Sequence, residues 1–129
     1  MTLAVDFDGT IVEHRYPKIG PEKPFAIQTL RQLQREGHRV ILFTSREGEL
    51  LEEAVKFCHE RGLDFYAVNS NQPANALFSR QTAKVIADIY IDDRNLGGLP
   101  GWDEIYRMIG QNRMEERKRR SFHSWFRRH

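Results

Sequence analysis

Two pairs of aspartates follow apolar runs in this sequence of 129 residues. Asp6 and Asp8 come after the run nearest the N-terminus, and their side chains point the same way because alternate residues of an extended segment do so. Asp92 and Asp93 come after the apolar run at residues 85–91. Carboxylates this close repel one another unless they share a proton or a cation. Since oxygen ligands suit a hard cation, the two pairs together indicate a site for Mg²⁺, which also binds substrate phosphate.

The apolar runs predict the strands that must position these carboxylates. The sequence predicts four strands, at residues 2–5, 40–43, 65–68 and 85–91. Apolar residues at helical spacing predict three helices, at residues 24–36, 47–61 and 102–109. Strands that alternate with helices indicate an α/β fold, here a three-layer, doubly wound parallel sheet covered by helices on both faces.

Further polar residues follow the middle strands. Thr44 and Ser45 come after the second predicted strand, and Asn69 comes after the third. Ligands of such sheets bind beyond the carboxyl ends of the strands, which is where all these side chains are expected. The aspartates have an alternative interpretation as residues that merely cap loops. That interpretation suits one pair, whereas two pairs at strand ends favour a shared site.

Taken in order, these motifs resemble those of the haloacid dehalogenase superfamily of phosphohydrolases. Residues 6–10, Asp-Phe-Asp-Gly-Thr, are similar to the first motif, and residues 43–45, Phe-Thr-Ser, are similar to the second. Lys84 and the strand end at residues 90–93, Tyr-Ile-Asp-Asp, are similar to the third and fourth motifs. The ordered set lies within residues 1–95, and it implies a Rossmann-like core of this superfamily.

The resemblance implies a role for each aspartate. Asp6 would be the nucleophile that forms an aspartyl-phosphate, and Asp8 would be the general acid and base. Mg²⁺ would lie between the Asp6 carboxylate, the main-chain carbonyl of Asp8 and a carboxylate of Asp92 or Asp93. The sequence does not distinguish which member of the last pair is the ligand. The implied activity is hydrolysis of phosphate monoesters.

The same resemblance implies a phosphate-binding set. Thr44, through its hydroxyl and backbone N–H, and Lys84, as a point charge, would hold phosphate oxygens, and Ser45 lies beside them. Gly9 would let the backbone turn closely beneath the site. We therefore expect Gly9, Thr44, Ser45 and Lys84 around the phosphoryl group.

Three further residues are candidates for substrate contact, each with an alternative. Arg46 follows the second motif and would grip the substrate, or else stabilise the helix beside it. His14 lies in the irregular segment after the first motif and would line the entrance, or else belong to a solvated loop. Asn69 would contact the leaving group, or else serve as a turn-forming residue.

The spacing of the motifs leaves no room for a cap domain. Residues 11–39 hold one predicted helix, and residues 47–83 hold a helix, a strand and a loop. The chain thus resembles the capless branch of the superfamily, whose members accept large substrates or use a neighbouring surface to close the site. We expect a phosphorylated substrate, large or small, and consider a homo-oligomer that closes the site.

The last residues differ in character from the rest. Residues 111–129 carry seven Lys or Arg and two Glu, a charge of +5, which leaves −3 for residues 1–110 because the whole chain carries +2. Phe122, Trp125 and Phe126 have helical spacing. We predict a core at residues 1–110 and a basic, helical tail at residues 111–129.

The basic tail allows three interpretations. It packs on the core or on another subunit, it is a solvated end, or it binds RNA, DNA or another anionic surface. If the tail binds nucleic acid, the function would be different. The protein would then be a nucleic-acid-binding module, or a phosphatase that acts on nucleic-acid ends.

Composition excludes several classes of protein. Cys58 is the single cysteine, so an internal disulfide is excluded and no paired spacing suggests zinc. Charges interrupt every apolar stretch, so we expect no membrane span. The N-terminus lacks the pattern of a signal peptide, and a cytoplasmic location is expected.

Overall fold

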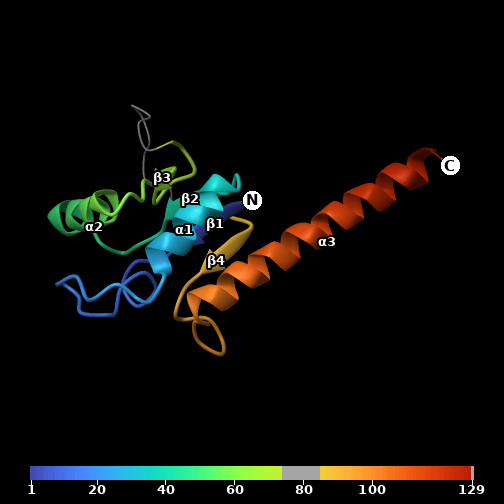
Figure 1. The fold of residues 1–129 in the computed structure, drawn as a ribbon. Helices are drawn as coiled ribbons and strands as arrows, with labels where there is room; N and C mark the ends of the chain where they lie inside the picture. Colours follow the sequence, from blue (N-terminus) through green and yellow to red (C-terminus); the bar gives the residue numbers. More distant parts are fainter. Residues whose placement is uncertain (74–84, 129) are drawn as a thin grey trace. The chain divides into compact units, whose positions relative to one another are not determined.

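The computed structural model describes residues 1–73 and 85–128 of the chain (Figure 1). It confirms the predicted α/β class, with parallel strands flanked by helices. The elements, in chain order, are β1 (Thr2–Val5), α1 (Ala26–Arg35), β2 (Arg39–Leu42), α2 (Gly48–Glu60), β3 (Ala67–Val68), β4 (Ile89–Ile91) and α3 (Trp102–Arg128). Among these residues no further domain interrupts the connections between strands, as the sequence predicts for a capless protein. The three-layer arrangement stays a prediction.

Within residues 1–73 and 85–128 the sheet has four strands in the order β3-β2-β1-β4, and all pairs are parallel. Val5 pairs with Leu42 on one side and with Ile91 on the other. The central strands are apolar at successive positions because both of their faces are covered, and Leu3, Val5 and Leu42 have no exposed surface. Since the strands run the same way, their carboxyl ends meet at one edge.

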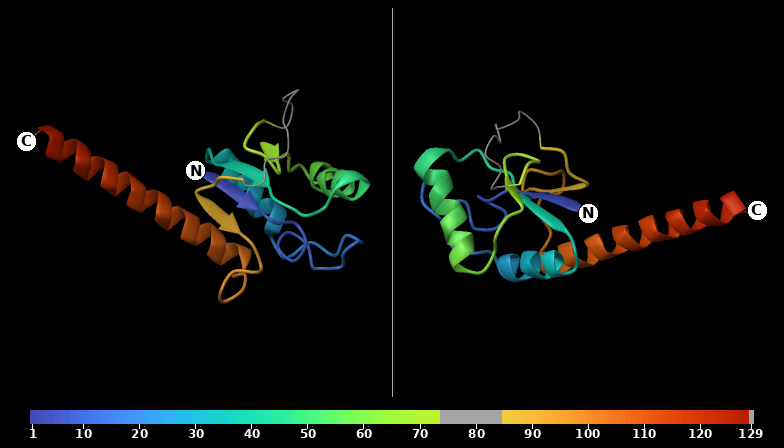
Figure 2. Two further views of the ribbon diagram at one scale, coloured as in Figure 1. Left: turned by 180° about the vertical axis from the view of Figure 1, so that it is seen from behind. Right: turned by 90° about the horizontal axis from the view of Figure 1, so that it is seen from above.

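Helices α1 and α2 lie alongside this sheet, and Figure 2 shows them from two further directions. Helix α1 buries its apolar stripe, which includes Ile27, Leu30 and Leu33, and it packs against β2. Helix α2 buries Ala54 and Cys58. Burial raises the pKa of the Cys58 thiol to about 12, which suits a core residue.

The two outer strands are shorter than predicted, and next to β4 the cause is that side chains bind the backbone before the strand. The Asn71 amide donates to the Ile86 carbonyl (2.6 Å) and accepts from the Ile86 N–H (2.8 Å). The Tyr90 hydroxyl binds the Val85 carbonyl and the Ala87 N–H. These backbone groups are therefore unavailable to a strand ladder, and β4 begins only at Ile89.

The chain forms two compact units, Met1–Leu99 and Pro100–His129. In the second unit the helix predicted at residues 102–109 and the predicted helical tail are a single helix, α3. The boundary predicted after residue 110 lies inside α3, because Gly110 costs a helix only about 1 kcal/mol and does not end it. A functional division between core and tail stays a prediction. Among the described residues no helix is both long and apolar enough to span a bilayer.

Candidate active site

Hydrogen bonds continue the sheet one residue past three strands. The Asp6 N–H donates to the Ile91 carbonyl (3.0 Å), the Phe43 N–H to the Val5 carbonyl (2.8 Å) and the Asn69 N–H to the Leu42 carbonyl (2.8 Å). The segments that follow β1, β2, β3 and β4 therefore leave the sheet at the same edge, where the sequence places its polar residues.

A cavity of about 550 Å³ opens at this edge of the sheet. Its lining residues are Asp6, Asp8, His14, Tyr16, Phe43, Thr44, Ser45, Asp92, Asp93 and Arg94. The structure thus brings together the four predicted aspartates and three other predicted site residues: His14, Thr44 and Ser45. Gly9, Arg46 and Asn69 are not in the lining, and Lys84 lies outside the described residues.

Three carboxylates converge on one side of the cavity. Asp6, Asp92 and Asp93 each offer an oxygen, and these oxygens lie within 4.8 Å of one another. A set of three carboxylate oxygens fits a hard divalent cation. The sequence did not distinguish whether Asp92 or Asp93 would be the ligand. In the structure both belong to the cluster. The Asp8 side chain is not a member, so its expected contribution through the main-chain carbonyl stays a prediction.

Burial and charge crowding change the acidity of this cluster. Desolvation, with the charges of Asp92, Asp93 and Asp8, raises the pKa of Asp6 to about 7, against the lowering effect of a hydrogen bond from the Phe7 N–H (2.8 Å). Desolvation, followed by a hydrogen bond with Asp92 and its charge, raises the pKa of Asp93. A bound cation would oppose both shifts by compensating the negative charge.

Gly9 and Thr10 position Asp93 within the cluster. Gly9 has φ +83°, and a Cβ atom there would lie 2.1 Å from Oδ2 of Asp93. Only glycine allows this carboxylate to approach the turn after β1. The Asp93 N–H donates to the buried Thr10 hydroxyl oxygen (3.2 Å). Thr10 was not predicted as a site residue, although it belongs to the motif that contains Gly9.

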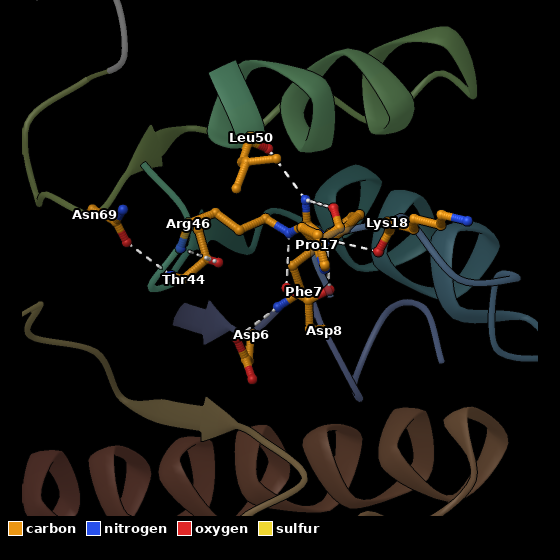
Figure 3. Close-up of polar contacts among 9 residues, drawn as sticks. All are labelled: Asp6, Phe7, Asp8, Pro17, Lys18, Thr44, Arg46, Leu50 and Asn69. Atoms are coloured by element: carbon orange, nitrogen blue, oxygen red, sulfur yellow. Dashed lines mark hydrogen bonds and ion pairs between the residues drawn. The ribbon is translucent and has the colours of Figure 1, made fainter. Parts of the chain in front are cut away.

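The Asp8 carboxylate forms a two-point ion pair with Arg46 (Figure 3). Nε of Arg46 donates to Oδ2 of Asp8, and Nη2 donates to Oδ1, both at 2.8 Å. The Arg46 side chain is fully buried, while 12% of the Asp8 side chain is exposed. Arg46 was a candidate for substrate contact, but its guanidinium binds the Asp8 carboxylate, and Arg46 is not among the residues that line the cavity.

Thr44 is held by its neighbours through both of its predicted binding groups. Its N–H donates to Oδ1 of Asn69 (2.8 Å), and its hydroxyl oxygen accepts from the Arg46 N–H (3.1 Å). The N–H predicted to bind phosphate is therefore engaged in this structure, and the hydroxyl proton is the donor left to Thr44. Asn69 supports Thr44, which accounts for its position beside the cavity without lining it.

The sequence analysis did not select Phe43 and Arg94, which line the cavity. Phe43 was assigned to the second strand, but β2 ends at Leu42 and Phe43 is 40% exposed. Arg94 directly follows the aspartate pair, which was the available signal. Tyr16 shares with His14 the irregular segment that was expected at the entrance, and both line the cavity.

Comparison with solved structures finds a relative with the same fold. It is described as a conserved protein coded by a locus from Bacteroides thetaiotaomicron, with 57% sequence identity and a TM-score of 0.79. The match covers 87% of this chain and 91% of that chain. The chain belongs to the family of that Bacteroides protein. No model of a known protein family matches the chain, and no curated protein matches it.

Proposed function

We propose that this protein is a Mg²⁺-dependent phosphohydrolase of the haloacid dehalogenase superfamily, which hydrolyses phosphate monoesters through an aspartyl-phosphate on Asp6. The observation that carries the proposal is the convergence of Asp6, Asp92 and Asp93 within 4.8 Å in a cavity that Asp8 also lines. A nucleophile, a second carboxylate and a cation-binding set in one cavity are what phosphoryl transfer to a carboxylate needs.

Asp6 and Asp8 divide the chemistry between them. A carboxylate oxygen of Asp6 attacks phosphorus, and an O–P bond forms as the bond from phosphorus to the leaving oxygen breaks. The Phe7 N–H binds Oδ1 of Asp6 and fixes the orientation of the attacking group. Asp8, in its protonated form, donates its proton to the leaving oxygen and becomes the carboxylate. It then accepts a proton from the water that attacks phosphorus, which releases phosphate and restores Asp6.

The remaining residues hold charge and substrate. Mg²⁺, when bound by Asp6, Asp92 and Asp93, would compensate negative charge on the phosphoryl group. The Thr44 hydroxyl and Ser45 lie at the cavity surface, where they would donate to phosphate oxygens, and Lys84 is proposed for the same task by its motif. A phosphatase screen with small and large phosphorylated substrates identifies the substrate class, and the oligomeric state in solution shows whether a second copy closes the site.

A phosphatase assay with matched carboxylate variants tests the proposal. We expect Mg²⁺-dependent release of phosphate from p-nitrophenyl phosphate, and a loss of at least about 10³-fold in Asp6→Asn. Asp8→Asn should also lose most of the activity. Asp64→Asn is the control, because Asp64 is exposed and binds His59 outside the cavity. Equal activity of the wild type and Asp6→Asn would contradict the proposal.

Binding of nucleic acid is the second candidate function. It is favoured by four consecutive basic residues, 117–120, which are exposed on α3. Charge of this density releases counterions from a phosphate backbone, so the affinity should fall steeply with salt. Retention of oligonucleotides at low salt, measured with and without residues 113–129, tests it. A phosphatase that acts on nucleic-acid ends would need both Mg²⁺-dependent phosphatase activity and retention of oligonucleotides that depends on the tail.

A further inference from the structure

We propose that Arg46 is a positioning residue that holds the Asp8 carboxylate and the cavity loop, residues 14–18, in one fixed arrangement. The inference rests on the proposed function, since Asp8 is the proton donor and acceptor there. It assigns a task to a residue that touches neither the cavity surface nor the acidic cluster.

The two-point ion pair with Arg46 fixes the plane of the Asp8 carboxylate. Two donors of one guanidinium meet two oxygens of one carboxylate at 2.8 Å each, so rotation of the Asp8 side chain would break both bonds. Each oxygen retains acceptor capacity after accepting one hydrogen bond. Because Asp8 lines the cavity, that capacity is available there to a proton and to a leaving oxygen.

The same guanidinium binds the cavity loop. Nη1 of Arg46 donates to the Pro17 carbonyl (3.3 Å), and Nη2 donates to the Lys18 carbonyl (3.0 Å). The guanidinium carbon lies 5.2 Å from the centre of the Tyr16 ring, within the range of a cation–π contact. His14 and Tyr16 of this loop line the cavity. Figure 3 shows Arg46 between Asp8 and the carbonyls of Pro17 and Lys18.

Further contacts engage the remaining N–H donor and a face of the Arg46 guanidinium. Nη1 also donates to the Leu50 carbonyl (3.4 Å) in α2, and the Phe7 ring centre lies 5.2 Å from the guanidinium carbon. Since the side chain is fully buried and its donors have partners, a substrate phosphate has no free donor to bind. Lysine cannot replace this arrangement, because an ammonium lacks the planar fork that serves a carboxylate and two carbonyls together.

A leaving-group series separates positioning from general loss of structure. A general acid matters most when the leaving oxygen is basic, so misplacement of Asp8 should harm hydrolysis of glycerol 2-phosphate more than that of p-nitrophenyl phosphate. We expect Arg46→Lys to lower kcat/KM, which reports formation of the aspartyl-phosphate, about 10-fold more for glycerol 2-phosphate than for p-nitrophenyl phosphate. KM and stabilisation by Mg²⁺ should change little. Equal losses for both substrates would overturn the proposal.

A double-mutant cycle tests whether Arg46 acts through Asp8. In an Asp8→Asn background, Arg46→Lys should change kcat by less than about twofold, because the group that it positions is already absent. If the losses in kcat of Arg46→Lys and Asp8→Asn multiply in the double variant, the inference is contradicted. Arg61→Lys is the matched control, since the Arg61 guanidinium also stacks on an aromatic ring, that of Phe57, but lies outside the cavity.

Limited trypsin digestion tests the link to the loop without measuring activity. Cleavage after Arg15 and Lys18 should be faster in both Arg46→Lys and Asp8→Asn than in the wild type, and unchanged in Arg61→Lys. Unchanged cleavage in both folded variants would overturn the coupling. An inactive wild type would instead reject the proposed phosphatase function, and the digestion would still report on the coupling.

Discussion

Burial and neighbouring carboxylates set the proton affinity of Asp6, and this has a consequence for stability. The pKa of Asp6 is raised from 3.8 to about 7 in the folded protein. An unfolded chain loses this proton near pH 4, whereas the folded chain keeps it until about pH 7. Between about pH 4 and pH 7 the folded state therefore binds more protons than the unfolded state. The contribution of Asp6 to the free energy of unfolding is fully present below pH 4 and is lost as the pH rises to 7.

The first prediction concerns the metal-free protein. Asp6→Asn removes the charge, so the variant should melt several degrees above the wild type at pH 8 and differ less from it at pH 4. Thermal unfolding in EDTA across this range measures the difference. The melting temperature of the variant should still depend on pH to some extent, because the pKa of Asp93 is raised as well. A wild type that is more stable than Asp6→Asn at pH 8 would contradict the cause assigned to the shift.

The second prediction concerns the metal. A cation must displace the proton from Asp6, so the affinity for Mg²⁺ should fall as the pH drops below about 7, by up to about tenfold per pH unit for one proton. Isothermal titration with Mg²⁺ at several pH values in two buffers of different ionisation enthalpy reports both the affinity and the proton released. An affinity independent of pH between 5 and 8 would argue against Asp6 as a ligand.

At the scale of elements, the turn after β1 sets the separation between Gly9 and Asp93. Both Gly9 and Gly37 have positive φ, but a Cβ at Gly9 would collide with the Asp93 carboxylate while one at Gly37 would meet nothing within 4 Å. The two glycines therefore share the backbone strain and differ in the collision.

The third prediction uses this difference. Gly9→Ala and Gly37→Ala should each lose about 1 kcal/mol of unfolding free energy from backbone strain. Only Gly9→Ala should also lower the affinity for Mg²⁺, by about tenfold or more, because Asp93 must move. Denaturant unfolding and Mg²⁺ titration of both variants provide the comparison. Equal Mg²⁺ affinities would show that the close approach is not required for the cluster.

At the scale of the whole molecule, every residue that lines the cavity belongs to the unit Met1–Leu99. The basic residues 117–120 belong to the other unit, on α3. The proposed chemistry and the alternative nucleic-acid function therefore depend on different units of the chain.

The fourth prediction is a truncation after Asn112, which keeps the buried Trp102, Ile105 and Ile109 of α3. Its kcat for p-nitrophenyl phosphate should stay within about twofold of the wild type, because no cavity residue is removed. Oligonucleotide retention, where the full chain shows it, should be lost. Loss of small-substrate activity on truncation would place the tail in the site, through a subunit contact or otherwise.

The ends of β1 are determined locally, because a buried parallel strand must be continuously apolar and its polar successors must leave at the sheet edge. Residues 2–5 are predicted and observed as β1, and Asp6 follows in both. The sequence also determined that Asp92 and Asp93 reach the edge that holds Asp6 and Thr44.

Tertiary structure alone decided the partners of these side chains. The ion pair of Arg46 joins residues 38 positions apart, and the engagement of Ile86 by Asn71, which shortens β4, spans 15. Neither has a periodic signal, because each depends on where distant backbone groups come to lie after the sheet forms. The sequence selected Arg46 as a residue near the site; burial and the geometry of its five donors decided that it faces Asp8.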